Sequence, residues 1–223
     1  MAIENNDVDL LYSLFEYQAS YREPIFSSLL NTDAFTKLYR AFSEWNVALN
    51  NISFNPNPTN AGEFRTTVEL LNRRYVFSST LGGASLSVTN PSWEEAEQII
   101  KIMRAGVESL KESTGAEIVE HSAQLSMHLK SKIKPAKDLT SGFLASSLTS
   151  ELTDDIRACG FSIYTENSVW IVDLSALDKE AIFVRLYMTF GSAVSFEEIA
   201  RAVNKDQEKI LEILRLKITE DEN

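Results

Sequence analysis

The chain has 223 residues, of which 44% are hydrophobic and 24% are charged. A chain of this size and composition buries enough surface for one large domain or two small ones, and it is too apolar to be intrinsically disordered. Its 32 acidic and 21 basic residues give a net charge of −11, which opposes non-specific attraction to nucleic acid and to anionic membranes.

The first segment, residues 1–54, is predicted to be mostly helical. Asp7 is placed to cap a first helix, and Asn31 or Thr32 is placed to cap a second. Apolar residues at helical spacing are Leu10, Leu11, Leu14 and Phe15 in the first, and Phe35, Leu38, Tyr39, Phe42 and Trp45 in the second. The prolines and glycine of NPNPTNAG, residues 55–62, then predict a loop or linker.

Residues 55–176 are predicted to form an antiparallel α+β domain. Alternating polarity indicates strands at residues 64–70, 75–81, 84–88 and 117–130, with turns at Asn72-Arg73 and Gly82-Gly83. Ser92 and Glu95 are spaced as a capping box, so a helix is expected to begin there and to end at Gly115. The sheet is therefore expected to carry a helix on one face.

A similar pattern follows in the second half of the chain. We expect a helix near residues 149–159, a hairpin of strands 161–165 and 169–174 around Glu166-Asn167, and a helix at residues 178–190. A hairpin followed by a helix thus occurs twice, at 63–113 and 160–190. The repetition lies in pattern and not in residue identity, and it is compatible with a duplicated architecture.

The last segment, residues 177–223, is predicted to be a three-helix unit. Within it, Ser195–Arg215 shows two short amphipathic helices joined by a polar turn, and Ser195 with Glu198 forms a capping box. The apolar positions of this seam are Ile199, Val203, Ile210 and Ile213.

Residues 195–217 resemble the helix-turn-helix family, in its winged-helix-like form. Ala200 stands where the first helix must pack closely, and Asn204 stands where the family usually has glycine. The resemblance implies that residues near the start of the second helix would read DNA: Lys205, Gln207 and Lys209. Acidic neighbours in the same helix, Asp206, Glu208 and Glu212, would repel phosphates, so a protein-docking unit remains the alternative.

Basic residues outside this segment suggest a small anion patch, made of Arg73, Arg74, Lys130, Lys132 and Lys134. The lysines would share one face if the strand at 117–130 continued through them. The alternative is a charged strand end that discourages edge pairing.

Two further residues invite a catalytic interpretation. His121 lies on the apolar face of its strand and Asp173 lies inside the apolar run VWIVDL, so the two could meet in a pocket. The simpler interpretation makes His121 a core histidine satisfied by a hydrogen bond and Asp173 a solvated strand end. No nucleotide-binding, zinc, calcium or nucleophile-elbow motif occurs in the sequence, so we expect no catalytic constellation, no metal and no cofactor.

The sequence therefore predicts an α+β protein with an antiparallel sheet, helices packed on one face of it, and a C-terminal three-helix unit. Because the start of the chain lacks a secretion signal and Cys159 is the only cysteine, we expect a cytoplasmic location and no membrane association. The expected function is non-catalytic binding, of another protein or of a second copy. The alternatives are a DNA-binding transcription regulator that uses residues 195–217, and an enzyme or small-ligand binder with a pocket on the sheet.

Overall fold

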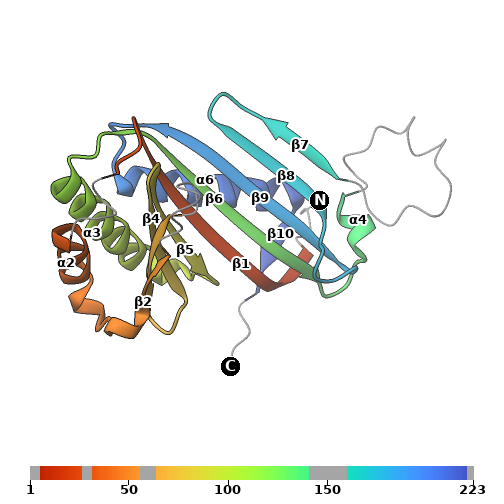
Figure 1. Cartoon of the computed structure of the whole chain (residues 1–223). Helices are drawn as coiled ribbons and strands as arrows, with labels where there is room; N and C mark the ends of the chain where they lie inside the picture. The colour runs from red at the N-terminus through yellow and green to blue at the C-terminus, as the bar shows by residue number, and fades with distance from the viewer. Residues whose placement is uncertain (1–5, 27–31, 56–63, 141–159, 220–223) are drawn as a thin grey trace. The chain divides into compact units, whose positions relative to one another are not determined.

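The computed structural model describes residues 6–26, 32–55, 64–140 and 160–219 (Figure 1). Its described strands are β1 Asn6–Tyr21, β2 Ile52–Asn55, β3 Arg65–Leu70, β4 Tyr75–Thr80, β5 Gly83–Thr89, β6 Ile118–Ser131, β7 Phe161–Tyr164, β8 Ser168–Leu174, β9 Ala181–Gly191 and β10 Leu216–Ile218. Its described α-helices are α2 Thr32–Ala41, α3 Ala96–Thr114, α4 Ala136–Thr140 and α6 Phe196–Leu214. The α+β class predicted from the sequence is confirmed.

The ten described strands belong to one sheet, in the order β2-β3-β4-β5-β1-β6-β9-β8-β7, and β10 pairs with β1 off this path. The sheet is antiparallel apart from the parallel pair of β1 and β10. The chain divides into two compact units: unit 1 comprises Met1–Ser13, Gln124–Met188 and Ala202–Asn223, and unit 2 comprises Leu14–Ala123 and Thr189–Arg201. The units interleave along the sequence, whereas the expected segments 1–54, 55–176 and 177–223 were consecutive.

Unit 2 is built on the meander β3-β4-β5, which was predicted. The turn between β3 and β4 needs three consecutive left-handed residues, Leu71, Asn72 and Arg73, with φ of 50°, 57° and 67°. Every second side chain of the meander is buried, including Val68, Phe77 and Leu86, which are directly opposite one another across the three strands. These side chains form the core of the unit.

Helix α3 covers this apolar face, and α2 packs against α3 (Figure 1). A Cβ added at Gly106 of α3 would fall on the ring of Phe77 and within 2.9 Å of the ring of Phe42, so the helix approaches the sheet at a glycine. The predicted end of α3 is confirmed, because Gly115 ends the helix with φ of 71°. At its start the Ser92 N–H donates to Glu95 Oε2 at 2.9 Å, but this capping box begins the 3-10 helix η4 Trp93–Glu95, and α3 follows from Ala96.

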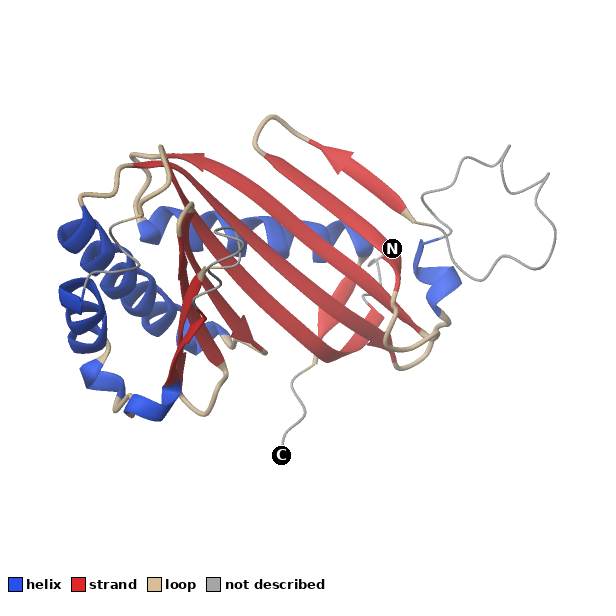
Figure 2. Cartoon of the chain, viewed as in Figure 1, coloured by secondary structure: helices blue, strands red, loops and turns tan. Residues whose placement is uncertain are grey.

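Unit 1 is built on the antiparallel strands β7, β8 and β9. The predicted hairpin at residues 161–174 is confirmed as β7 and β8, with Ser162 opposite Ile171. One face of β8 and β9 is buried and carries Trp170, Val172, Val184, Leu186 and Met188. Helix α6 covers this face (Figure 2), where the Trp170 indole N–H donates to Asp206 Oδ2 at 2.8 Å and Lys209 Nζ lies 5.1 Å from the Trp170 ring centroid.

Two predicted helices are strands. The expected helix at Asp7 is part of β1, in which Ser13, Phe15, Tyr17 and Ala19 are buried at every second position. The expected helix at 178–190 is largely β9, whose buried residues also alternate. In both segments neighbouring apolar residues happen to satisfy a helical spacing, but their β-branched and aromatic side chains favour a pleated, half-buried strand.

The expected three-helix unit is also wrong. Residues 196–214 form one uninterrupted helix of 19 residues, so the turn expected at Asn204 is absent. The described residues directly before α6 form the strand β9 Ala181–Gly191 in place of the helix expected at 178–190. The capping box at the start of α6 is confirmed, since Ser195 Oγ donates to Glu198 Oε2 at 2.7 Å and the Glu198 N–H donates to Ser195 Oγ at 3.2 Å.

The chain runs twice through three antiparallel strands followed by a 19-residue helix, first as β3-β4-β5-α3 and then as β7-β8-β9-α6. The sequence predicts this repetition as a hairpin followed by a helix. In the second copy the predicted helix at 178–190 is the third strand, β9, and the helix of the repeat is α6. Of the loop expected at 55–62, Asn55 is the last residue of β2, and the rest lies outside the described residues, as does the helix expected at 149–159.

Candidate functional site

The face of unit 1 opposite α6 carries large side chains that are only partly buried, and no described helix lies over it on β8 and β9 (Figure 2). We call it the open face and define it by seven residues from four strands: Tyr12, His128, Val169, Ile171, Phe183, Arg185 and Tyr187. All seven are half-buried except Tyr187, which is 38% exposed. The face of an antiparallel sheet that contacts only solvent is usually polar, so this apolar composition indicates a candidate interaction surface.

Three rings cross the open face from strand to strand. The ring centroids of Tyr12 and His128 lie 6.0 Å apart, and those of His128 and Phe183 lie 5.0 Å apart. The guanidinium carbon of Arg185 lies 6.0 Å from the Phe183 centroid, within reach of a cation–π interaction. Burial lowers the pKa of His128, which keeps its ring neutral at neutral pH.

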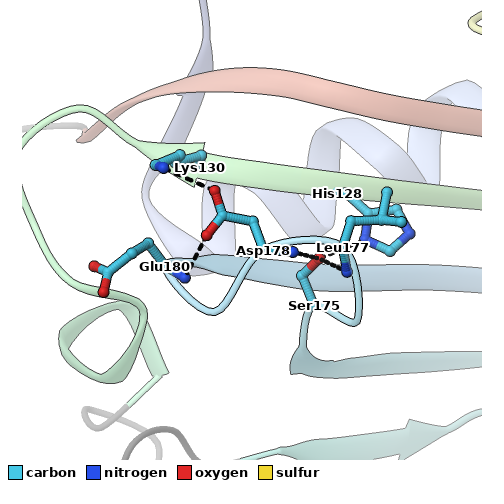
Figure 3. A network of polar contacts seen from close by, with 6 residues as sticks. All are labelled: His128, Lys130, Ser175, Leu177, Asp178 and Glu180. Carbon is cyan, nitrogen blue, oxygen red and sulfur yellow. Dashed lines mark hydrogen bonds and ion pairs between the residues drawn. The ribbon is translucent and has the colours of Figure 1, made fainter.

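The turn between β8 and β9 reaches back to β6 at one end of the open face (Figure 3). Ser175 Oγ lies 2.7 Å from His128 Nδ1, and it accepts the backbone N–H of Leu177 at 3.1 Å and of Asp178 at 3.4 Å. Because its lone pairs face those two donors, the Ser175 hydroxyl donates to Nδ1, and the proton of the neutral His128 ring is on Nε2.

A second contact holds the same turn. Lys130 Nζ donates to Asp178 Oδ2 at 2.7 Å, and the Glu180 N–H donates to Asp178 Oδ1 at 2.8 Å. The ion pair with Lys130 lowers the pKa of Asp178, and the same contact raises the pKa of Lys130.

This network resembles a nucleophile with its base only in its short Ser175–His128 distance. Ser175 is buried, and its hydroxyl already stabilises the turn. Asp178, the carboxylate of the network, is bound to Lys130, so it does not orient the histidine as in a catalytic triad. The arrangement fixes the turn and the His128 ring beside the open face.

The corresponding face of unit 2 has a different composition. A row of polar side chains crosses five neighbouring strands, in register: Ser53, Thr67, Ser78, Ser85 and Gln18. Thr67 Oγ1 and Ser78 Oγ lie 3.4 Å apart in this row. Such a face is suited to contact with water, whereas the open face of unit 1 presents rings and aliphatic side chains.

The residues predicted to read DNA lie on α6 in unit 1. Gln207 is buried, Lys205 is exposed, and the Lys209 ammonium lies over the Trp170 ring. Asp206, between them in sequence, holds the Trp170 indole. This stretch of α6 is therefore engaged in packing the helix on the sheet.

The predicted anion patch is divided between the two units and is largely paired. Arg73 binds Glu69 at 2.8 Å and Arg74 binds Glu95 through two bonds of 2.9 Å, all in unit 2. In unit 1, Lys130 binds Asp178 and Lys132 binds Asp9 at 3.0 Å, while Lys134 is exposed. Because β6 ends at Ser131, the last two lysines lie beyond the strand.

His121 is a core histidine, as expected. Its Nδ1 accepts the Tyr17 hydroxyl at 2.7 Å, and the Phe196 ring meets its edge with centroids 6.0 Å apart. Burial lowers the pKa of His121, and a hydrogen bond to the Ser192 backbone opposes this in part. Asp173 is an exposed strand-end residue that accepts the Leu174 N–H at 2.7 Å, and it belongs to unit 1 whereas His121 belongs to unit 2.

Within the described residues, no three His, Cys, Asp or Glu side chains lie close enough together to hold a metal ion. None of the helices in that part of the chain is long and apolar enough to cross a membrane. No known family model matches the chain, and no curated protein matches it either.

Proposed function

We propose that the protein is a non-catalytic binding module that receives another protein on the open face of unit 1. The observation that supports this most directly is the series of half-buried rings Tyr12, His128 and Phe183, aligned across three strands. Aromatic residues and arginine are enriched in the buried centres of protein interfaces. His128 and Lys130, beside the rings, are already bonded to Ser175 and Asp178, so burying these two contacts under a partner would carry a small desolvation cost.

Two variants separate this surface from the rest of the molecule. Ile171→Thr combined with Tyr187→Thr removes apolar area from the open face and places threonine, which favours strands, at both positions. Val76→Thr is the matched control, because Val76 is half-buried on the polar face of unit 2.

The full chain is used as bait in host extract, and the proteins retained by each form are quantified by mass spectrometry. Sedimentation velocity on the purified forms measures self-association. We expect a protein that is retained by the wild type and by Val76→Thr but not by the double variant. If the occupant is a second copy, the dimer should form in the first two forms and be lost in the double variant. Retention of the same proteins by all three forms, with no change in oligomeric state, would contradict the proposal.

The DNA-binding alternative makes an opposite prediction. Proteins that bind DNA non-specifically neutralise several phosphates, so their affinity falls steeply as salt rises. We expect no fluorescence-anisotropy change with a labelled duplex at low salt. A salt-dependent complex that is abolished by Lys205→Glu with Lys209→Glu would favour a role for 195–217 in DNA binding instead.

A further inference from the structure

Arg185 occupies an unusual electrostatic position on the open face. Its cross-strand neighbour is Ile171, and Phe183 and Tyr187 flank it on the same side of β9. Its guanidinium carbon lies 6.0 Å from the Phe183 ring centroid. Within the described residues it forms no ion pair, although it is half-buried among apolar groups.

The two lysines near the open face are already paired. Lys130 is paired with Asp178 at 2.7 Å and Lys132 with Asp9 at 3.0 Å. His128 is held by Ser175. Asp173 lies opposite Phe183, is exposed, and accepts the Leu174 N–H, a bond that leaves its negative charge in place. In a chain whose net charge is −11, Arg185 is therefore a half-buried cation between Phe183 and Tyr187, while the exposed Asp173 lies two residue pairs further along the strands without forming an ion pair with it.

We propose that the open face binds an extended segment of a partner protein in which a carboxylate lies between aromatic or aliphatic side chains, and that Arg185 binds this carboxylate. The inference rests on the proposed function and names the chemistry of its partner. A guanidinium presents two parallel N–H donors that match a carboxylate, and contact with a ring face leaves this fork available. The flanking apolar groups would pack on Ile171, Phe183 and Tyr187.

Two other occupants fit the charges less well. A second copy of the chain seated face to face would bring two unpaired guanidinium groups together on a shared apolar surface, where like charges repel strongly. A single nucleic-acid strand offers aromatic stacking but also a phosphate at each nucleotide, and its affinity depends on several cations. Of the basic side chains around this face, Lys130 and Lys132 are already bound to carboxylates.

The test uses a random heptapeptide display library selected against the full chain and, in parallel, against Arg185→Gln. Each selected peptide is then synthesised in two forms, one with its Asp or Glu and one in which that residue is replaced by Asn or Gln. The affinities of both forms are measured by fluorescence anisotropy. Arg65→Gln is the matched control, since Arg65 is an exposed arginine on β3 of unit 2. A twenty-nucleotide oligo(dT) probe is measured with the same protein forms.

We expect the wild type to enrich peptides with a carboxylate next to apolar residues. Arg185→Gln should weaken them by about tenfold, the amide peptides should lose affinity to a similar extent, and Arg65→Gln should have no effect. Arg185→Lys should restore part of the affinity, because it keeps the charge but not the fork.

The possible failures are distinguishable. Enriched peptides without carboxylates, or affinities unchanged in Arg185→Gln but lost in Ile171→Thr with Tyr187→Thr, would overturn this inference and leave the proposed function standing. Binding of oligo(dT) that requires Arg185 would overturn it in favour of nucleic acid. If no peptide is enriched, the inference and the proposed docking surface both fail. The same holds if the enriched peptides bind equally well to Arg185→Gln and to Ile171→Thr with Tyr187→Thr.

Discussion

The Tyr17 hydroxyl donates to His121 Nδ1 at 2.7 Å in the core of unit 2, and the two rings stack with an interplanar angle of 27°. The contact joins β1 to β6 over a separation of 104 residues. Burial raises the pKa of Tyr17 and lowers the pKa of His121, so both groups stay neutral over the physiological range. The pair is thus a fixed polar contact inside an apolar core.

Removing one partner of this contact should destabilise the protein. In Tyr17→Phe the ring packing is kept, but a buried nitrogen of His121 loses its donor, which costs about 1–2 kcal/mol in free energy of unfolding. Urea denaturation followed by circular dichroism measures this change. Tyr164→Phe is the control, because Tyr164 is 75% exposed, and its midpoint should match the wild type. Equal effects of the two substitutions would contradict the buried contact.

Stability should fall on mild acidification, through both histidines of the chain. Burial lowers the folded-state pKa of His121 and of His128 below the unfolded value of about 6.5. As pH falls below that value, the unfolded chain binds protons that the folded chain does not, so the free energy of unfolding decreases. Above it the contribution is constant.

The measurement is the urea midpoint at pH 7.5 and at pH 5.5, for the wild type and for His121→Gln combined with His128→Gln. The carboxylates contribute equally to both forms, so their effect cancels in the difference. We expect the wild type to lose more stability over this interval than the double variant. A double variant with the same or a larger loss would show that these rings are not responsible.

The continuity of α6 can be tested at Asn204, where the sequence suggested a turn. In a helix interior Asn204→Ala should stabilise the protein by about 0.5 kcal/mol, and Asn204→Gly should be slightly destabilising. A left-handed turn residue would respond with the opposite signs, because Ala is strained there and Gly is not. The sign of the two changes in thermal or urea unfolding therefore decides between one helix and two.

Gly106→Ala should be destabilising although alanine favours helices. The added Cβ would meet the rings of Phe77 and Phe42, which must move within a packed core at a cost of about 1–3 kcal/mol. Gly82→Ala is the matched control, since a Cβ at Gly82 has no heavy atom within 4 Å. The urea midpoint of Gly106→Ala should be clearly lower than that of Gly82→Ala. An unchanged midpoint in Gly106→Ala would mean that α3 lies further from the sheet.

The sequence predicted those parts of the fold that depend on local chemistry. The turn at Asn72-Arg73 and the helix end at Gly115 were readable because both use a left-handed backbone conformation. The capping boxes at Ser92 and Ser195 were readable from the spacing of serine and glutamate. The turn at Gly82-Gly83 was readable from its glycines, although the structure requires glycine there only at Gly83, where a Cβ would meet the Ala19 carbonyl.

It failed where the periodicity was ambiguous. In β1, Leu10 and Leu11 are followed four residues later by Leu14 and Phe15, a spacing that fits an amphipathic helix as well as a strand. The strand is selected by pairing with β5 over Leu14–Ser20. In α6, Asn204 and Lys205 are residue types that are common in turns. The helix nevertheless continues through them, and Asp206 and Lys209 in its next turn contact Trp170.

The open face was missed for a different reason. Tyr12, His128 and Phe183 come from three strands that are far apart in the sequence, and nothing local specifies the register that brings their rings together. The segments of Tyr12 and Phe183 were moreover predicted to be helices, so only the strands that carry His128, Val169 and Ile171 were recognised as strands. Arg185 therefore gave no signal in the sequence beyond that of a polar residue in an apolar run.

The parallel pairing of β1 with β10 has a consequence for how the protein is made. Asn6–Val8 lies beside Leu216–Ile218, with the Asn6 N–H donating to the Arg215 carbonyl at 2.8 Å and the Thr219 N–H to the Val8 carbonyl at 3.0 Å. During synthesis, the Asn6–Val8 end of β1 must wait for residues more than two hundred positions later before this pairing forms. Until then its backbone donors and acceptors are open to water, chaperones or a neighbouring nascent chain.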